Sequence, residues 1–115
     1  MNTIKIYHNP RCTKSRETLC LLEERGHKPQ ITEYLKSTPS EKELKQILKM
    51  LGMKAEEIVR KKEPLFIAKF SKKKYSEAEW IKILLRNPIL MERPIVVKGN
   101  KAVIGRPPEN VNKLL

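Results

Sequence analysis

The first 35 residues carry the pattern of a strand, a helix and a second strand, in about the shortest length that such a unit occupies. Ile4–Tyr7 alternates in hydropathy as a strand does, and the turn that follows contains a proline. A helix is predicted from about Cys12 to Arg25, ended by a glycine. Ile31–Leu35 is expected to form the second strand. This order favours an α/β fold.

The middle of the chain changes to helical spacing. Capping-box motifs begin two predicted helices, one at Ser40 that ends before Gly52 and one at Ser76 that ends at an Asn-Pro pair. Between them we expect a short helix from about Ala55 to Arg60 and a break where a proline follows. A helical insertion over about 38–87 follows from this pattern.

Strand patterns return near the C-terminus. The segments 94–97 and 102–104 flank a Gly-Asn pair that suits a tight hairpin, and Pro107-Pro108 precedes a short final helix. The order βαβ, helices, β-hairpin, helix is that of a thioredoxin-like mixed sheet with a helical insertion. Because 115 residues suffice for one modest core, we expect a single domain over 1–115.

Composition and charge limit the partners and the location that can be expected for the protein. The net charge is +12, which attracts small oxyanions, acidic proteins or other anions, although a lysine-rich surface kept for solubility explains it equally well. No apolar run approaches the roughly 20 residues of a membrane span, and no signal-peptide pattern opens the chain. Aromatic residues make up only 5% and do not alternate with a basic stripe, so we expect no nucleic-acid or membrane partner. A cytoplasmic location is predicted.

Cys12 is the first candidate for chemistry. It follows a strand and a proline-containing turn where a helix begins, and there free backbone N–H groups and the helix dipole favour a thiolate. Arg11, Lys14 and Arg16 add positive charge nearby. A cysteine kept only as a small buried hydrophobe fits these polar neighbours poorly. We therefore predict a nucleophilic thiolate, with no metal and no bound cofactor.

The motif from Cys12 to Ser15 is C-x-x-S, so a hydroxyl stands where a dithiol redox site has its second sulfur. From spacing alone, Ser15 is expected to donate a hydrogen bond to the thiolate. Cys20 lies about 12 Å further along the predicted helix, too far to form a disulfide with Cys12, and its leucine neighbours predict a buried side chain. Any adduct on Cys12 must therefore be released by an outside thiol.

Several segments together resemble one known family. They are Ile6-Tyr7-His8-Asn9-Pro10-Arg11-Cys12, Glu33-Tyr34-Leu35, Val59-Arg60-Lys61-Lys62, Asn87-Pro88-Ile89-Leu90 and Arg93-Pro94-Ile95-Val96-Val97. In this order they are similar to the glutaredoxin-coupled arsenate reductase family, which is related to the Spx regulators. The likeness runs nearly end to end. Three positions differ from the family's pattern: Thr13-Lys14 stands where a Gly-Thr pair is found, and Arg11 stands where a small residue is typical.

The resemblance implies a thioredoxin-like fold and a cysteine, here Cys12, that attacks the arsenic of arsenate. Glutathione as co-substrate and glutaredoxin as partner would then complete the reduction to arsenite. It further implies that His8 helps to keep the thiolate. The oxyanion-binding arginines and the cis-proline of the family fall on four positions here: Arg60, Arg93, Arg106 and Pro94.

Residue chemistry supports the arginines independently. Guanidinium offers a tetrahedral oxyanion a planar set of donors, whereas lysine offers a point charge. Arg93 precedes a proline at the start of a predicted strand, and Arg106 follows the last strand, so both lie where strand ends would face a site. Arg60 ends a predicted helix, where a cation could simply offset the helix dipole.

Two other functions remain open at this stage. A regulator that binds RNA polymerase, like the Spx proteins, would share the fold, but Ser15 removes the C-x-x-C switch that such proteins often carry. A glutathione-dependent thiol reductase without arsenate chemistry would use the same cysteine. Arsenate turnover, polymerase binding and reduction of a glutathionylated substrate separate the three functions.

Overall fold

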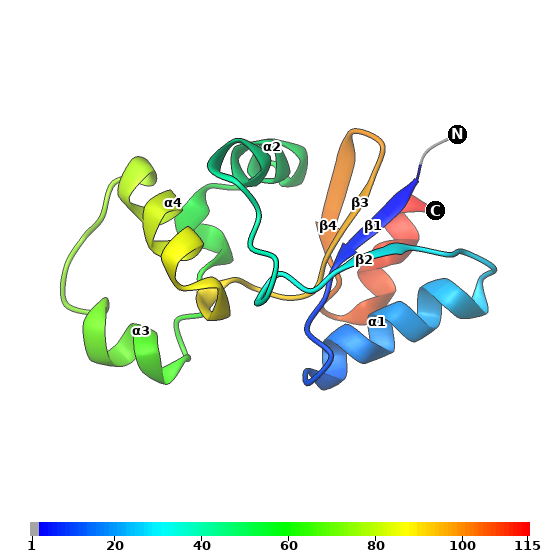
Figure 1. Cartoon of the computed structure of the whole chain (residues 1–115), viewed down its shortest axis with the longest axis horizontal. Helices are drawn as coiled ribbons and strands as arrows, with labels where there is room; N and C mark the ends of the chain where they lie inside the picture. Colours follow the sequence, from blue (N-terminus) through cyan, green and yellow to red (C-terminus); the bar gives the residue numbers. More distant parts are fainter. Residues whose placement is uncertain (1–2) are drawn as a thin grey trace. The chain divides into compact units, whose positions relative to one another are not determined.

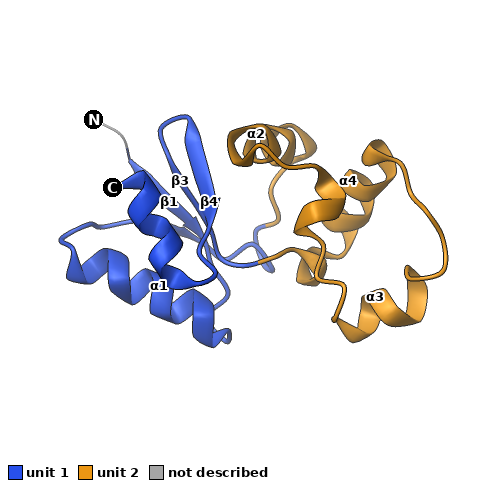
Figure 2. Cartoon of the chain, turned by 180° about the vertical axis from the view of Figure 1, so that it is seen from behind, with its two compact units in different colours: residues 1–37, 93–115 blue, residues 38–92 orange. Residues whose placement is uncertain are grey.

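The computed structural model describes residues 3–115 (Figure 1). The elements in chain order are β1 (Ile4–Tyr7), α1 (Thr13–Glu24), β2 (Gln30–Thr32), α2 (Glu41–Leu51), the 3-10 helix η1 (Ala55–Ile58), α3 (Pro64–Lys69), α4 (Glu77–Arg86), the 3-10 helix η2 (Pro88–Leu90), β3 (Ile95–Lys98), β4 (Lys101–Ile104) and the 3-10 helix η3 (Pro108–Leu114). The chain forms two compact units, unit 1 with residues 1–37 and 93–115 and unit 2 with residues 38–92 (Figure 2). The predicted helical insertion over about 38–87 lies within unit 2.

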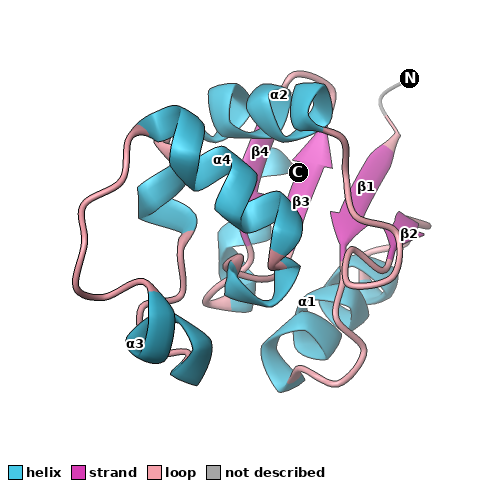
Figure 3. Ribbon diagram, turned by 60° about the vertical axis from the view of Figure 1, so that its left-hand side comes forward, coloured by secondary structure: helices cyan, strands magenta, loops and turns pink. Residues whose placement is uncertain are grey.

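Unit 1 is built on a four-stranded mixed sheet with the strand order β2-β1-β3-β4 (Figure 3). β1 pairs with β2 in parallel and with β3 antiparallel, and β3 continues into β4 through the predicted hairpin. Gly99 makes the hairpin turn with a φ of 63°, a conformation that glycine adopts without strain. The α/β prediction with a mixed sheet, an N-terminal βαβ unit and a C-terminal hairpin is therefore confirmed.

The core of unit 1 lies where α1 and η3 pack on the sheet. Its members are apolar side chains of β1, α1, β3 and η3 that are at most 9% exposed: Ile4, Ile6, Leu22, Val96, Val111 and Leu114. Because these residues hold α1 against the strands, the start of α1 is fixed next to the end of β1. That is where Cys12 lies.

Unit 2 is helical, and its two main helices begin where the sequence predicts. The Ser40 hydroxyl accepts a hydrogen bond from the Glu43 N–H at 3.1 Å, and Ser76 and Glu79 form a complete capping box on α4. The apolar faces of α2 and α4 form the core of unit 2. Trp80, on α4, contacts three other aromatic rings.

Three local predictions were wrong. β2 ends at Thr32 instead of reaching residue 35, because the strand that it pairs with, β1, ends at Tyr7 and offers no further partner. The break expected before Pro64 is the start of helix α3, since proline fits the first turn of a helix. The predicted helix over 55–60 ends at Ile58, so Arg60 lies two residues beyond η1, and its N–H donates to the Leu90 carbonyl at 2.7 Å.

No helix among residues 3–115 has the length and hydropathy needed to span a bilayer.

Candidate active site

A tight turn between β1 and α1 places Cys12. The carbonyl of Asn9 accepts from the Cys12 N–H at 3.0 Å, and its side-chain Oδ1 accepts from the Arg11 N–H, also at 3.0 Å. These bonds satisfy backbone donors in the turn and hold Cys12 at the N-cap position of α1. The Cys12 side chain is 8% exposed.

The electrostatic balance at Cys12 favours the thiolate. Burial of the sulfur raises the pKa of Cys12, but the Arg93 guanidinium, through hydrogen bonding and charge, acts against burial. The backbone N–H groups of Ser15 and Lys14, which the first turn of a helix leaves unpaired, act in the same direction. Together they outweigh burial, so the pKa of Cys12 is lowered from its ordinary value.

Arg93 is the side chain that contributes most to this balance. Burial opposes its charge, yet the Cys12 sulfur and the Tyr34 hydroxyl together raise the pKa of Arg93 above its ordinary value. Its Nε–H is buried, and no residue within 3–115 accepts a hydrogen bond from it. The peptide bond from Arg93 to Pro94 is cis. One donor of the guanidinium is therefore unused beside the sulfur.

His8 and Ser15 form a buried pair next to Cys12. His8 Nδ1 lies 2.6 Å from Ser15 Oγ, and Ser15 Oγ also accepts from the Asn9 N–H at 3.0 Å. Burial lowers the pKa of His8, with Arg16 acting in the same direction and Glu33 against it. Since a neutral imidazole is favoured, Ser15 can donate its proton to His8 Nδ1.

This geometry corrects the expected role of the Ser15 side chain. The hydroxyl bonds to His8 and to the Asn9 amide, and it is the main-chain N–H of Ser15 that acts on the Cys12 sulfur. Burial lowers the pKa of His8, which favours the neutral imidazole beside Ser15.

The remaining predicted arginines lie in different settings. Arg106 follows β4 in unit 1 and is exposed, and its carbonyl accepts from Asn110 Nδ2 at 3.1 Å. Arg60 belongs to unit 2, where its guanidinium forms an ion pair with Glu63 at 3.0 Å and donates to the Ile89 carbonyl at 3.1 Å. Unit 1 thus brings Cys12, Arg93 and the His8–Ser15 pair together.

Cys20 is exposed, which contradicts the prediction that it is buried. Its thiol donates to Glu24 Oε1 at 3.4 Å, and that hydrogen bond together with the carboxylate charge raises the pKa of Cys20. The apolar neighbours in sequence were misleading because α1 buries only the face that carries Leu22. The two thiols therefore differ in the direction of their pKa shifts.

Sequence reasoning missed Tyr34 and Asn9. The strand pattern predicts Tyr34 within the second strand, but Tyr34 lies in the turn after β2, is 2% exposed, and its hydroxyl acts on Arg93. Asn9 belongs to the family-like segment that ends at Cys12, but no role was predicted for its side chain. An Asn one residue before a proline and three before a cysteine is a usable signal, since Asn side chains accept hydrogen bonds from nearby backbone N–H groups.

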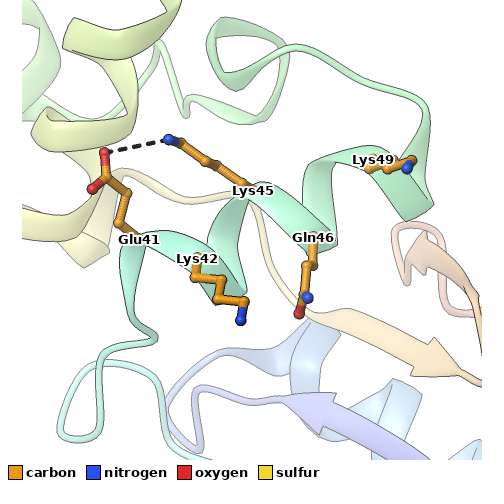
Figure 4. A pocket seen from close by; sticks show the side chains of 5 residues that line it. All are labelled: Glu41, Lys42, Lys45, Gln46 and Lys49. Carbon is orange, nitrogen blue, oxygen red and sulfur yellow. Dashed lines mark ion pairs between the residues drawn. The ribbon is translucent and has the colours of Figure 1, made fainter.

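Two surface hollows lie elsewhere, in unit 2. One, of about 360 Å³, is lined by residues of α2 alone, with an ion pair of 3.7 Å between Lys45 and Glu41 (Figure 4). The other, of about 450 Å³, is lined by Tyr75, Trp80 and three charged residues. Neither includes a predicted site residue. Within residues 3–115, no three His, Cys, Asp or Glu side chains are grouped so that they could hold a metal ion.

Comparison with known proteins adds an independent line of evidence. The model of the ArsC family matches residues 7–114. The chain is 48% identical to the uncharacterized protein YfgD of Escherichia coli K12, covering 97% of this chain and 96% of that one. It is 44% identical to the arsenate reductase of Haemophilus influenzae, covering 98% and 99%.

Solved structures agree with this. The arsenate reductase from Vibrio cholerae superposes with a TM-score of 0.93 at 41% identity, covering 99% of this chain and 98% of that one. The putative arsenate reductase from Yersinia pestis gives a TM-score of 0.90 at 45% identity, covering 96% and 98%.

Proposed function

The chain belongs to the ArsC family, and from this membership we propose that it is a thiol-dependent arsenate reductase with Cys12 as its nucleophile. One observation carries the assignment of the nucleophile. Cys12 lies at the start of α1, and despite its burial its pKa is lowered by Arg93 and two backbone amides. The thiolate is the form that attacks an electrophile. The relatives named arsenate reductase support arsenic as that electrophile.

In the proposed reaction the Cys12 thiolate attacks arsenic, a sulfur–arsenic bond forms, and a protonated oxygen of arsenate leaves as hydroxide, which takes a proton from solvent to become water. A glutathione thiol then forms a second sulfur–arsenic bond, and a second arsenate oxygen leaves as water with the proton of that thiol. A glutaredoxin thiol attacks the glutathione sulfur, so that a disulfide forms, the sulfur–arsenic bond to glutathione breaks, and its electron pair reduces As(V) to As(III). Water finally releases arsenite and returns the Cys12 thiolate.

The basic residues stabilise charge in this scheme. Arg93 holds the thiolate in the resting site, and its unused Nε–H can donate to an arsenate oxygen as Cys12 becomes covalently bound. Arg60 and Arg106 are proposed as further oxyanion ligands, and Pro94 as the residue that faces the bound thiol. His8 and Ser15 are proposed to maintain the ionised site through their hydrogen bond.

An external reductant follows from the single thiol. Ser15 stands where a resolving cysteine would be, and the exposed Cys20 lies well along α1. The electrons must therefore come from another molecule. Glutathione and glutaredoxin are the proposed donors, and because such thiols are kept reduced in the cytosol we propose a cytoplasmic location.

The test is arsenate reduction in the presence of glutathione and glutaredoxin. Cys12→Ser should reduce the formation of arsenite to background, because a serine hydroxyl stays protonated at neutral pH and cannot form the sulfur–arsenic bond of the proposed reaction. Cys20→Ala is the matched control and should keep most of the activity, since Cys20 is exposed and its pKa is raised. Equal losses in both variants would contradict the assignment of Cys12.

The same preparation separates the regulatory alternative. Purified RNA polymerase is captured with the intact chain and with Cys12→Ser. Polymerase binding without arsenate turnover would replace the enzyme proposal with an Spx-like one. Reduction of a glutathionylated substrate without arsenate turnover would leave Cys12 as nucleophile and change only the substrate.

A further inference from the structure

Thr18 is a fully buried polar residue of α1 that the proposed chemistry does not use. Its hydroxyl lies 2.8 Å from the Lys14 carbonyl on its own helix and 3.0 Å from the Gly105 carbonyl at the end of β4. The one hydroxyl proton is thus shared between two acceptors. The second of these bonds connects the helix that carries Cys12 to the opposite edge of the sheet.

Gly105, which follows β4, is connected in turn to Pro94, which precedes β3. We call this pair of residues the Gly105–Pro94 corner. The Gly105 N–H donates to the Pro94 carbonyl at 2.8 Å, and Pro94 is buried. A Cβ at position 105 would lie 2.8 Å from Thr18 Cγ2, 2.9 Å from Thr18 Oγ1 and 3.0 Å from Pro94 Cγ. The three residues therefore approach as closely as a glycine permits.

These contacts close a ring around the site. Cys12 begins α1, Thr18 joins α1 to Gly105, Gly105 joins Pro94, and Arg93 precedes Pro94 and interacts with Cys12. We propose that Thr18 is a positioning residue, whose hydroxyl ties α1 to the Gly105–Pro94 corner and thereby fixes the Arg93 guanidinium against the Cys12 sulfur. The inference deepens the proposed function, because it takes Cys12 as the nucleophile.

The interaction between Arg93 and the Cys12 sulfur tolerates less displacement than the packing around it. A hydrogen bond between a guanidinium and a sulfur weakens steeply as its distance and angle change, whereas the packing of a helix on a sheet tolerates small shifts. Loss of the Thr18 hydroxyl also leaves the buried Gly105 carbonyl without this donor, which favours a shift of the corner towards another partner. Arg93, one residue from Pro94, would move with it.

The test measures the rate at which iodoacetamide alkylates Cys12 at a series of pH values. The parental chain is the full chain with Cys20→Ala, so that Cys12 is the thiol that reacts. Thr18→Val keeps the shape of the side chain and removes its hydroxyl. We expect its profile to move to higher pH, with alkylation about threefold to tenfold slower at pH 7. Thr18→Ser keeps the hydroxyl and should restore the parental profile.

A matched control separates positioning from stability. Ile4→Val removes one methyl group from the core of unit 1, at the end of β1 away from Cys12, and should destabilise the fold without moving the profile. Gly105→Ala, which forces Thr18 and Pro94 apart, should move the profile as Thr18→Val does. If circular dichroism shows that Thr18→Val does not fold, the alkylation profile of Gly105→Ala takes its place. A parental profile in Gly105→Ala would then contradict the positioning role.

The outcomes distinguish this inference from the proposed function. A folded Thr18→Val with the parental profile, or an Ile4→Val that moves the profile equally far, would overturn the positioning role. A parental profile at the pH of an ordinary cysteine would instead overturn Cys12 as an activated nucleophile. Alkylation consumes no arsenate, so the result does not depend on the identity of the substrate.

Discussion

The charge that acts on Cys12 comes from a distant part of the chain. Arg11, Lys14 and Arg16 are its basic neighbours in sequence, but all three side chains are exposed. The guanidinium that lowers the pKa of Cys12 belongs to Arg93, at the start of the C-terminal hairpin. An exposed charge is strongly screened by water, whereas a partly buried charge next to the sulfur is screened much less.

Arg93→Ala should therefore slow alkylation of Cys12 several-fold at neutral pH, because burial would then raise the pKa of Cys12 with less opposition. Iodoacetamide rates against pH, in the Cys20→Ala background, provide the measurement. Arg11→Ala removes an equal charge one residue from Cys12, from an exposed side chain, and should change the profile less. A larger effect from Arg11→Ala would show that proximity in sequence, not burial, determines the activation.

The role of a single residue could be predicted only where it depends on neighbouring residues in the sequence. Cys12 could be placed at a helix start because the turn and the helix pattern are both encoded nearby. The Tyr34–Arg93–Cys12 arrangement could not, since it depends on the chain returning to the sheet after unit 2. Cys20 was misplaced because leucines at 19, 21 and 22 do not reveal which face of α1 is buried.

At the scale of elements, helix ends with side-chain signals were the most predictable features. Ser40 and Ser76 cap α2 and α4 as expected, because their hydroxyls meet N–H groups three residues away. The end of β2 depends instead on where β1 ends, which no residue of β2 encodes. The start of α3 was missed because the same proline that interrupts a helix also fits its first turn.

Removal of the cap on α4 should weaken unit 2. Ser76→Ala loses a hydrogen bond of 3.2 Å to the Glu79 N–H, and we expect the free energy of unfolding to fall by about 1 kcal/mol. Urea unfolding followed by fluorescence of Trp80, the one tryptophan of the chain, reports on α4 directly. Ser71→Ala is the control: the Ser71 hydroxyl donates to the Ile67 carbonyl at 2.8 Å, but this bond is exposed and water replaces the lost donor, so the free energy of unfolding should change by less than about 0.5 kcal/mol. Equal effects would contradict the capping role.

At the scale of the whole molecule, the α/β architecture was predictable because strand patterns occur only near the two ends of the chain. A sheet formed from both ends must bring residues 93–106 back beside residues 4–12. The sequence pattern thus implied that the start of α1 and the end of the helical segment would share one sheet. Side-chain packing within that sheet, such as the contact of Thr18 with Gly105, had no sequence signature.

Ionisation of Cys12 links the site to global stability. Because the pKa of Cys12 is lowered in the folded chain, the unfolded chain holds more protons between that pKa and the ordinary value of about 8.5. Stability therefore rises with pH across this window, is fully present above about pH 8.5, and is lost as pH falls through the folded pKa.

The comparison of the Cys20→Ala chain with a variant that also carries Cys12→Ser isolates this contribution. Urea unfolding at a series of pH values should give a difference in the free energy of unfolding that grows in favour of the thiol as pH rises through the window. Cys20→Ala in both chains leaves Cys12 as the only thiol of the pair that titrates, so the pH dependence of each chain is also free of the Cys20 thiol, whose pKa is raised. A difference that does not change with pH would mean that folding does not stabilise the Cys12 thiolate. The attraction between Arg93 and the sulfur would then be too weak to activate it.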